Sequence, residues 1–309
     1  MHRLFTATIL LAIAFGSPLH AQDASMPITG LAQQLRWNEP AEPMRIVGPV
    51  HFVGTRGLTS WLITTTAGHI LLNTGMPPSG ELIEASIRKL GFKPEDVKLL
   101  LTCHAHVDHV GGLAYLKRVT GAQVVALDAE VELIQSGGKT DFNYGSVPEF
   151  QFAPVQVDRV IHDGDKVTLG DVTLMALKTA GHTRGTTTWV MNATEGERSF
   201  TVVFADGTSV NPGYRLVKRP SYPGIADDYR NTFHTLAALT PDIWLTPHTE
   251  PFAFDAKRAR AASDGVNAWV DPEGYRNWVD AQRKKFEAAV KKESAPRVSA
   301  ADKRSVAAR

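Results

Sequence analysis

The sequence predicts a layered α/β fold, in which two β-sheets pack face to face and helices cover the outside. Short β-rich runs follow one another near the start of the chain, and strands then alternate with helices through its middle. A second group of short strands follows, together with two longer helices. A parallel doubly wound sheet is the competing fold, but so many short consecutive strands count against it.

The first half of this pattern starts as a meander of β-rich runs separated by glycine-containing turns. These runs span residues 50–53, 61–65 and 69–73. Apolar residues recur at helical spacing over residues 81–90, and Gly91 provides a C-terminal stop for that helix. The elements expected next are a strand at 97–101, a helix at 111–119, a strand at 123–127 and a helix at 129–135.

The second half repeats the theme. Its expected strands lie at residues 166–169, 172–178, 186–191, 200–204 and 243–245. Its expected helices lie at residues 228–239 and 275–291. We find neither an internal repeat nor a low-complexity linker, so a single domain over residues 44–296 is the simplest organisation.

Both ends of the chain are expected to lie outside this domain. Residues 1–21 have the pattern of a secretory signal peptide, with a basic start, a short apolar run and a small residue at Ala21, after which we expect cleavage. That run is too short to span a bilayer. Residues 22–43 are expected to form an irregular arm and residues 297–309 a frayed tail. An exported protein without disulfides suits the periplasm.

The composition excludes several classes of function. The chain has 33 Lys and Arg against 32 Asp and Glu, so we expect no binding to nucleic acid or to a membrane surface. Its single cysteine, Cys103, excludes an intramolecular disulfide and any zinc site that needs two thiolates. A metal site must therefore be built from histidine and carboxylate, and Cys103 is expected to pack in the interior.

The most informative segment is the hexapeptide at residues 104–109, which follows the expected strand at 97–101. It contains His104, His106, Asp108 and His109. A protein core has little use for so many imidazoles, since each carries a donor and an acceptor that must be satisfied. Neutral imidazole and carboxylate are instead preferred ligands of zinc. In an extended loop, residues 104 and 106 can face one ion while 108 and 109 face another, so the hexapeptide predicts a metal site.

Two ions need more ligands than this segment provides. His182 and His248 both follow expected strands, and Gly181 lets the backbone approach the site closely. We assign both to the metal site. The remaining histidines of the mature chain are interpreted as surface or hydrogen-bonded residues outside it, namely His51, His69, His162 and His234.

With these residues assembled, the chain resembles the metallo-β-lactamase superfamily from about residue 43 to residue 290. The resemblance is closest to the third subclass of class B β-lactamases, which uses only His and Asp ligands. The hexapeptide and the Gly181-His182-Thr183 stretch identify the superfamily. The resemblance also rests on Phe204-Ala205-Asp206-Gly207. Three further stretches indicate the subclass, Pro212-Gly213-Tyr214-Arg215-Leu216, Asp227-Asp228-Tyr229-Arg230 and Thr246-Pro247-His248.

This resemblance implies a four-layer αββα sandwich and two zinc ions (Zn²⁺) per chain. His104, His106 and His182 would hold the first ion, and Asp108, His109 and His248 the second. The implied reaction is opening of the β-lactam amide by a hydroxide held on the metals, with Asp108 orienting that nucleophile and passing a proton to the nitrogen. The implied protein is a monomer that acts on small-molecule β-lactams and confers antibiotic resistance.

The sequence departs from the family pattern around the site. Asn73 stands where relatives have an aspartate that supports the metal site from behind the ligands, and Gly207 stands where the subclass commonly has serine. Without that serine, Thr208 and Ser209 are the candidates for holding a substrate carboxylate. Aromatic residues are expected to flank the substrate, and these are Trp37, Trp61, Phe142, Tyr144 and Phe150.

The main alternative is another hydrolase of the same superfamily, a lactonase or a glyoxalase-type thioesterase. In those enzymes a carboxylate bridges both metals, and Asp206 is the only plausible candidate here. The lack of a separate helical substrate domain and the Pro-Gly-Tyr-Arg-Leu stretch favour the β-lactamase. A scaffold protein without activity would also retain histidines, but the presence of Asp108 argues for turnover.

Overall fold

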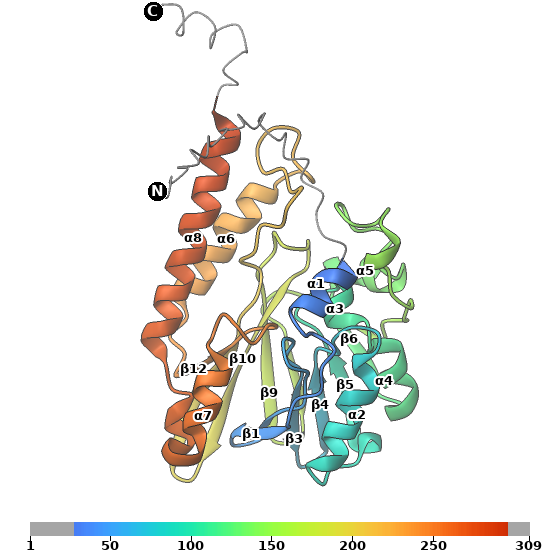
Figure 1. The fold of residues 1–309 in the computed structure, drawn as a ribbon, viewed down its shortest axis with the longest axis vertical. Coiled ribbons are helices and arrows are strands. Elements are labelled where there is room, and N and C mark those ends of the chain that lie inside the picture. The colour runs from blue at the N-terminus through green and yellow to red at the C-terminus, as the bar shows by residue number, and fades with distance from the viewer. Residues whose placement is uncertain (1–27, 296–309) are drawn as a thin grey trace, which may run out of the picture.

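Two β-sheets pack face to face in the computed structural model, which describes residues 28–295 (Figure 1). The seven-stranded sheet has the order β1-β2-β3-β4-β5-β6-β7, and the five-stranded sheet has the order β12-β11-β10-β9-β8. The predicted signal peptide, residues 22–27 of the arm and the predicted tail lie outside the described residues. The two-sheet architecture is confirmed, and the doubly wound alternative is excluded.

The strands of the first sheet are β1 (Met44–Val47), β2 (Val50–Phe52), β3 (Trp61–Thr65), β4 (Gly68–Leu72), β5 (Val97–Leu101), β6 (Gln123–Leu127) and β7 (Arg159–Ile161). Those of the second are β8 (Lys166–Leu169), β9 (Val172–Lys178), β10 (Thr187–Glu195), β11 (Arg198–Phe204) and β12 (Ile243–Leu245). The helices are α1 (Ile28–Gln34), α2 (Ser79–Lys89), α3 (Val107–Val110), α4 (Leu113–Thr120), α5 (Val131–Gln135), α6 (Ile225–Ala238), α7 (Phe254–Asp264) and α8 (Pro272–Ser294).

The layers follow from strands that are apolar on both faces. In β3, Trp61 and Ile63 belong to the core between the sheets, whereas the intervening Leu62 belongs to the core under the helices. Because successive side chains of a strand point to opposite faces, each central strand contributes to both cores. Figure 1 shows α2 and α4 outside one sheet and α6 and α8 outside the other, which gives the four-layer αββα order.

The strand ends position the functional loops. β4, β5, β6 and β7 pair in parallel, and so do β11 and β12. The carboxyl ends of parallel strands meet at one edge of a sheet, and loops at such an edge are held by a rigid scaffold. The indole of Trp189 in β10 donates to the Thr102 carbonyl oxygen at 3.0 Å and so joins the two sheets beside the end of β5.

The predicted elements are present, with differences where tertiary packing decides the structure. The arm was expected to be irregular, but residues 28–34 form α1, and Ile28, Ala32 and Trp37 pack into the core under the helices. The hexapeptide was expected to form an extended loop in which residues 108 and 109 turn to another side, and that turn is the one-turn helix α3 after His106. β1, β7 and α7 were not predicted, since short or largely polar elements carry weak periodicity. No helix within residues 28–295 is long and apolar enough to cross a membrane.

Candidate metal centre

Four loops that follow β5, β9, β11 and β12 bring the site residues together. His104 and His106 lie on the extended stretch after β5, and α3 then turns Asp108 and His109 to a different side. His182 follows β9, and His248 follows β12. The hexapeptide residues and His182 are all buried, so their polar atoms must find partners within the protein or in a bound ion.

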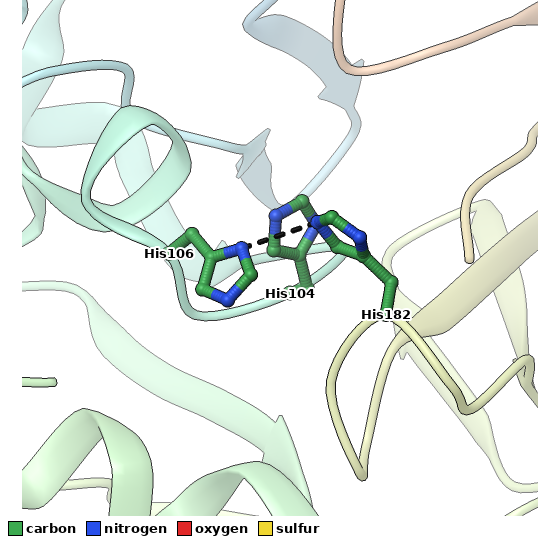
Figure 2. A group of neighbouring side chains, drawn as sticks. All are labelled: His104, His106 and His182. Carbon is green, nitrogen blue, oxygen red and sulfur yellow. Dashed lines mark hydrogen bonds between the residues drawn. The ribbon is translucent and has the colours of Figure 1, made fainter. Parts of the chain in front are cut away.

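The first three histidines form a compact group of nitrogen atoms. The ligand nitrogens of His104, His106 and His182 lie within 4.8 Å of one another. His106 Nδ1 and His182 Nε2 are 3.1 Å apart, and Figure 2 shows the three rings turned toward a common centre. His104 Nε2 is buried, and it has no hydrogen-bond partner among the described residues.

An oxygen atom lies beside the opposite nitrogen of each of these rings. His104 Nδ1 lies 2.6 Å from Asp206 Oδ2, and His106 Nε2 lies 3.2 Å from Asp141 Oδ2. His182 Nδ1 lies 2.9 Å from the carbonyl oxygen of Ser209. A ring that donates its outer N–H presents an inward lone pair, which is how ligating histidines are oriented. The chemistry of this donor set therefore fits a zinc ion.

Asp108 is the carboxylate of the second group. Its Oδ2 lies 3.0 Å from His109 Nε2 and 3.5 Å from His248 Nε2. The contact with His109 lacks the geometry of a hydrogen bond, and both ring nitrogens of His109 have no hydrogen-bond partner among the described residues. The ligand atoms of Asp108 and His109 also lie within 4.8 Å of that of His104. The second group therefore adjoins the first, and its His109 ring has nitrogen atoms that are free to bind a cation.

The protonation states of these groups suit metal binding. Burial lowers the pKa of His182 and of His248 to about 4, so both rings are neutral at pH 7. Burial opposes ionisation of Asp108, but electrostatic attraction from the neighbouring His109 and His248 rings outweighs burial and holds the pKa of Asp108 well below its usual range. Burial also lowers the pKa of His106, but the Asp141 carboxylate outweighs this effect and raises it. Metal ligands must be deprotonated, and most of these groups already are.

Asp206 has a different role in this geometry. Its Oδ2 contacts His104 Nδ1, and its Oδ1 accepts the backbone N–H of Gly207 at 2.7 Å. Like His248, Asp206 belongs to neither of the two compact groups of ligand atoms that could hold an ion. One carboxylate oxygen of Asp206 thus orients the His104 ring, and the other holds the loop that contains Asp206 and Gly207.

Residues 53–248 match the family model described as the metallo-beta-lactamase superfamily. The chain belongs to the metallo-beta-lactamase superfamily. Its structure is similar to FEZ-1, a metallo-beta-lactamase from Legionella gormanii, with a TM-score of 0.82 and 39% identity over 84% of this chain and 98% of that one. It is also similar to LRA-12, a class B3 di-zinc metallo-beta-lactamase from an Alaskan soil metagenome, with a TM-score of 0.78 and 34% identity over 82% of this chain and 96% of that one.

Curated relatives with lower sequence identity are described as other hydrolases. A hydroxyacylglutathione hydrolase from Brucella anthropi is 25% identical over 48% of this chain and 50% of its own length. A probable metallo-hydrolase from Burkholderia pseudomallei is 29% identical over 51% of each. The chain spans about half the length of these curated relatives. The resemblance to the third subclass of class B β-lactamases is confirmed.

The Asn73 side chain hydrogen-bonds to residues next to the candidate ligands and, within the described residues, to none of those ligands. Its Oδ1 accepts the backbone N–H of Cys103 at 2.9 Å, and its Nδ2 donates to Cys103 Sγ at 3.6 Å. Its φ of 63° lies in the left-handed region, which asparagine tolerates better than most residues. Asn73 therefore supports the backbone after β5 at Cys103, one residue before His104, and Cys103 is buried as expected.

The predicted carboxylate-binding residues take other contacts. The Ser209 carbonyl accepts from His182 Nδ1 and from the Tyr229 hydroxyl at 2.6 Å, while its side chain is exposed. Thr208 is buried. Gly207 has a φ of 98°, and a Cβ there would overlap the Thr179 carbonyl oxygen, so serine does not fit in this loop. A role of either hydroxyl toward substrate stays a prediction.

The aromatic residues divide between the site and the core. The Trp37 ring lies 5.1 Å from that of His248, and the Tyr144 ring lies 5.5 Å from that of His106. The Phe142 ring packs against that of Tyr214, with centroids 4.9 Å apart, at the edge of the core between the sheets. Trp61 is buried between the sheets, so the expectation that it flanks substrate is wrong.

Sequence reasoning missed Asp141, because nothing in its local pattern marks it as a partner of a residue 35 positions away. Asp141 Oδ1 accepts the backbone N–H groups of Asn143 and Tyr144, and Oδ2 faces His106.

In Asp141→Asn, the amide NH₂ faces His106 Nε2 and forces the proton onto Nδ1, the nitrogen that would bind the metal. We expect zinc affinity to fall about 10- to 100-fold, measured by chelator competition. Asp171→Asn, at an exposed carboxylate that also accepts a backbone N–H, is the control, and equal affinities in both variants would contradict this role.

Proposed function

We propose that this member of the superfamily is a zinc-dependent β-lactam hydrolase that binds two zinc ions per chain. Support comes from the likeness to class B3 enzymes over more than four fifths of the chain. Further support comes from the donor set, in which each of three inward-facing histidines has its outer nitrogen held by an oxygen. When bound, zinc would supply Lewis acidity and make water a nucleophile at neutral pH.

The position of each site residue indicates its role in this reaction. His104, His106 and His182 would hold the first ion, and Asp108, His109 and His248 the second. Asp108 is the only member of these two sets that carries a negative charge, so it is suited to orient the attacking water and to pass a proton to the lactam nitrogen. Tyr144 beside His106 offers apolar surface to the substituents of a bicyclic lactam, and Trp37, which is largely buried beside His248, supports the opposite side of the site.

The contacts of Asp206 favour a β-lactamase over a glyoxalase-type thioesterase or a lactonase. A bridging role requires its carboxylate to face both ions. Here one oxygen contacts His104 Nδ1 and the other accepts the Gly207 N–H. The rival activity draws its support from the hydroxyacylglutathione hydrolases among the relatives.

The test compares substrates on one purified protein. A chromogenic cephalosporin, a simple lactone and a hydroxyacyl-glutathione thioester are each assayed before and after removal of metal by a chelator, and again after zinc is added back. We expect the cephalosporin to be hydrolysed far faster than the others, with activity lost on chelation and restored by zinc. Faster turnover of the thioester or lactone would replace this function with the rival one.

We also propose that the protein acts as a monomer in the periplasm and confers resistance to β-lactam antibiotics. The signal-peptide pattern of residues 1–21 supports export. Fractionation of cells that express the full chain, sedimentation of the purified protein and growth on a β-lactam test these points. A protein retained in the cytoplasm would overturn the proposed location.

A further inference from the structure

Glu130 is a buried carboxylate that none of the roles above uses. It follows β6 at the start of α5, and only 1% of its surface is exposed. Its Oε2 accepts the backbone N–H of Ala105 at 2.7 Å. Its Oε1 accepts the backbone N–H of Gly185 at 2.9 Å and the hydroxyl of Thr183 at 2.5 Å. One side chain thus receives three hydrogen bonds in the interior.

The three donors belong to the two segments that carry the first group of ligands. Ala105 lies between His104 and His106, and Thr183 follows His182 directly. Gly185 lets the second segment come close, since a Cβ there would lie 2.7 Å from Glu130 Cγ. These segments are about 80 residues apart in the chain, and Figure 2 shows their histidines facing each other. Glu130 therefore links the two backbone segments that carry these histidine side chains.

The sheets themselves do not need this link. The backbone N–H of Thr187 donates to the Cys103 carbonyl at 2.7 Å, and Trp189 donates to Thr102, so the strands are already joined below the site. Glu130 acts beyond those contacts, at the loop tips where the ligands lie. Both oxygens of this buried side chain accept hydrogen bonds from the two segments, which suits a group that must hold loops rigidly.

We propose that Glu130 is a positioning residue that pre-assembles His104, His106 and His182 for the first metal ion. This inference rests on the metal centre of the proposed function and not on its substrate. Without the carboxylate, the two segments would be free to separate, and the first ion would have to order them on binding. The effect should therefore appear in metal affinity and in the geometry of the bound metal, and not only in folding stability.

The test uses Glu130→Gln, which keeps the shape but offers one acceptor oxygen and an NH₂ group. That group cannot satisfy two backbone N–H donors on opposite sides. Metal-free protein is titrated with Zn²⁺ in competition with a chromophoric chelator, and separately with Co²⁺, whose absorption bands report coordination geometry. We expect the affinity for the first Zn²⁺ to fall about 10- to 100-fold, with altered Co²⁺ bands.

Glu293→Gln is the matched control, because that carboxylate also accepts two backbone N–H groups, from Leu216 and Lys218 at 2.7 Å each. It should lower stability without changing metal affinity. If Glu130→Gln does not fold, Glu130→Asp, which keeps the charge but is one methylene shorter, should show a smaller loss of affinity. First-ion affinity within about threefold of the parent in the folded variant, with unchanged Co²⁺ bands, would overturn the proposal.

The parent protein separates this inference from the proposed function. A parent that binds zinc but hydrolyses no β-lactam would overturn the proposed substrate, and the comparison between Glu130→Gln and the parent would still decide the role of Glu130. A parent that binds no zinc would overturn both.

Discussion

Asp108→Asn is expected to lower kcat for β-lactam hydrolysis about 10²- to 10⁴-fold, the range associated with loss of a positioned proton acceptor. The amide keeps the shape of the carboxylate but removes its charge beside His109 and His248, which lie 3.0 and 3.5 Å away. Zinc content should fall from two ions per chain toward one, since the second group loses its only anion. Steady-state kinetics and metal analysis of the same preparation measure both effects.

Asp128→Asn provides the control for this substitution. Asp128 Oδ2 lies 3.1 Å from His162 Nδ1, so it is also an aspartate paired with a histidine, but the pair is exposed and outside the site. Its loss should leave kcat and zinc content unchanged. Parent-like kcat in Asp108→Asn would show that Asp108 neither binds metal nor handles a proton.

The metal-free protein is expected to lose stability as the pH falls from about 6.5 to about 4. Burial lowers the pKa of His182 from 6.5 to about 4, so in this window the unfolded chain binds a proton that the folded chain excludes. The stability that neutral His182 provides is complete above pH 6.5 and is lost as the pH falls to about 4, which amounts to about 3 kcal/mol. His248 acts in the same direction with a smaller effect, because it is about a third exposed. His106, whose pKa is raised, acts in the opposite direction.

Denaturant unfolding of chelated protein at several pH values measures this dependence. The control is His182→Gln, which cannot titrate, so the difference in unfolding free energy between it and the parent isolates His182 from carboxylates that also titrate at low pH. That difference should change by about 3 kcal/mol across the window. A difference that stays constant would contradict the neutral state of His182.

Much of the fold could be predicted because its signals are local. β5, β6, β8 and β9 have the predicted bounds, since each is a short apolar or alternating run between turn residues. α1 could not be predicted in this way. Its helix forms because Ile28, Ala32 and Trp37 have a core to pack against, and isolated helices of this length are marginal in water.

The sequence by itself determined the metal-binding character of the site, because four potential ligands lie within six residues and a single cysteine excludes thiolate clusters. Only the tertiary structure decided which nitrogen of each ring faces inward. That choice depends on Asp206, Asp141 and the Ser209 carbonyl, which approach from other loops. Such contacts depend on how the loops meet in space, to within a few tenths of an ångström, and no spacing along the chain encodes them. For the same reason the role of Glu130 could not be predicted from the sequence, since it follows only from the hydrogen-bond donors that surround the side chain in the fold.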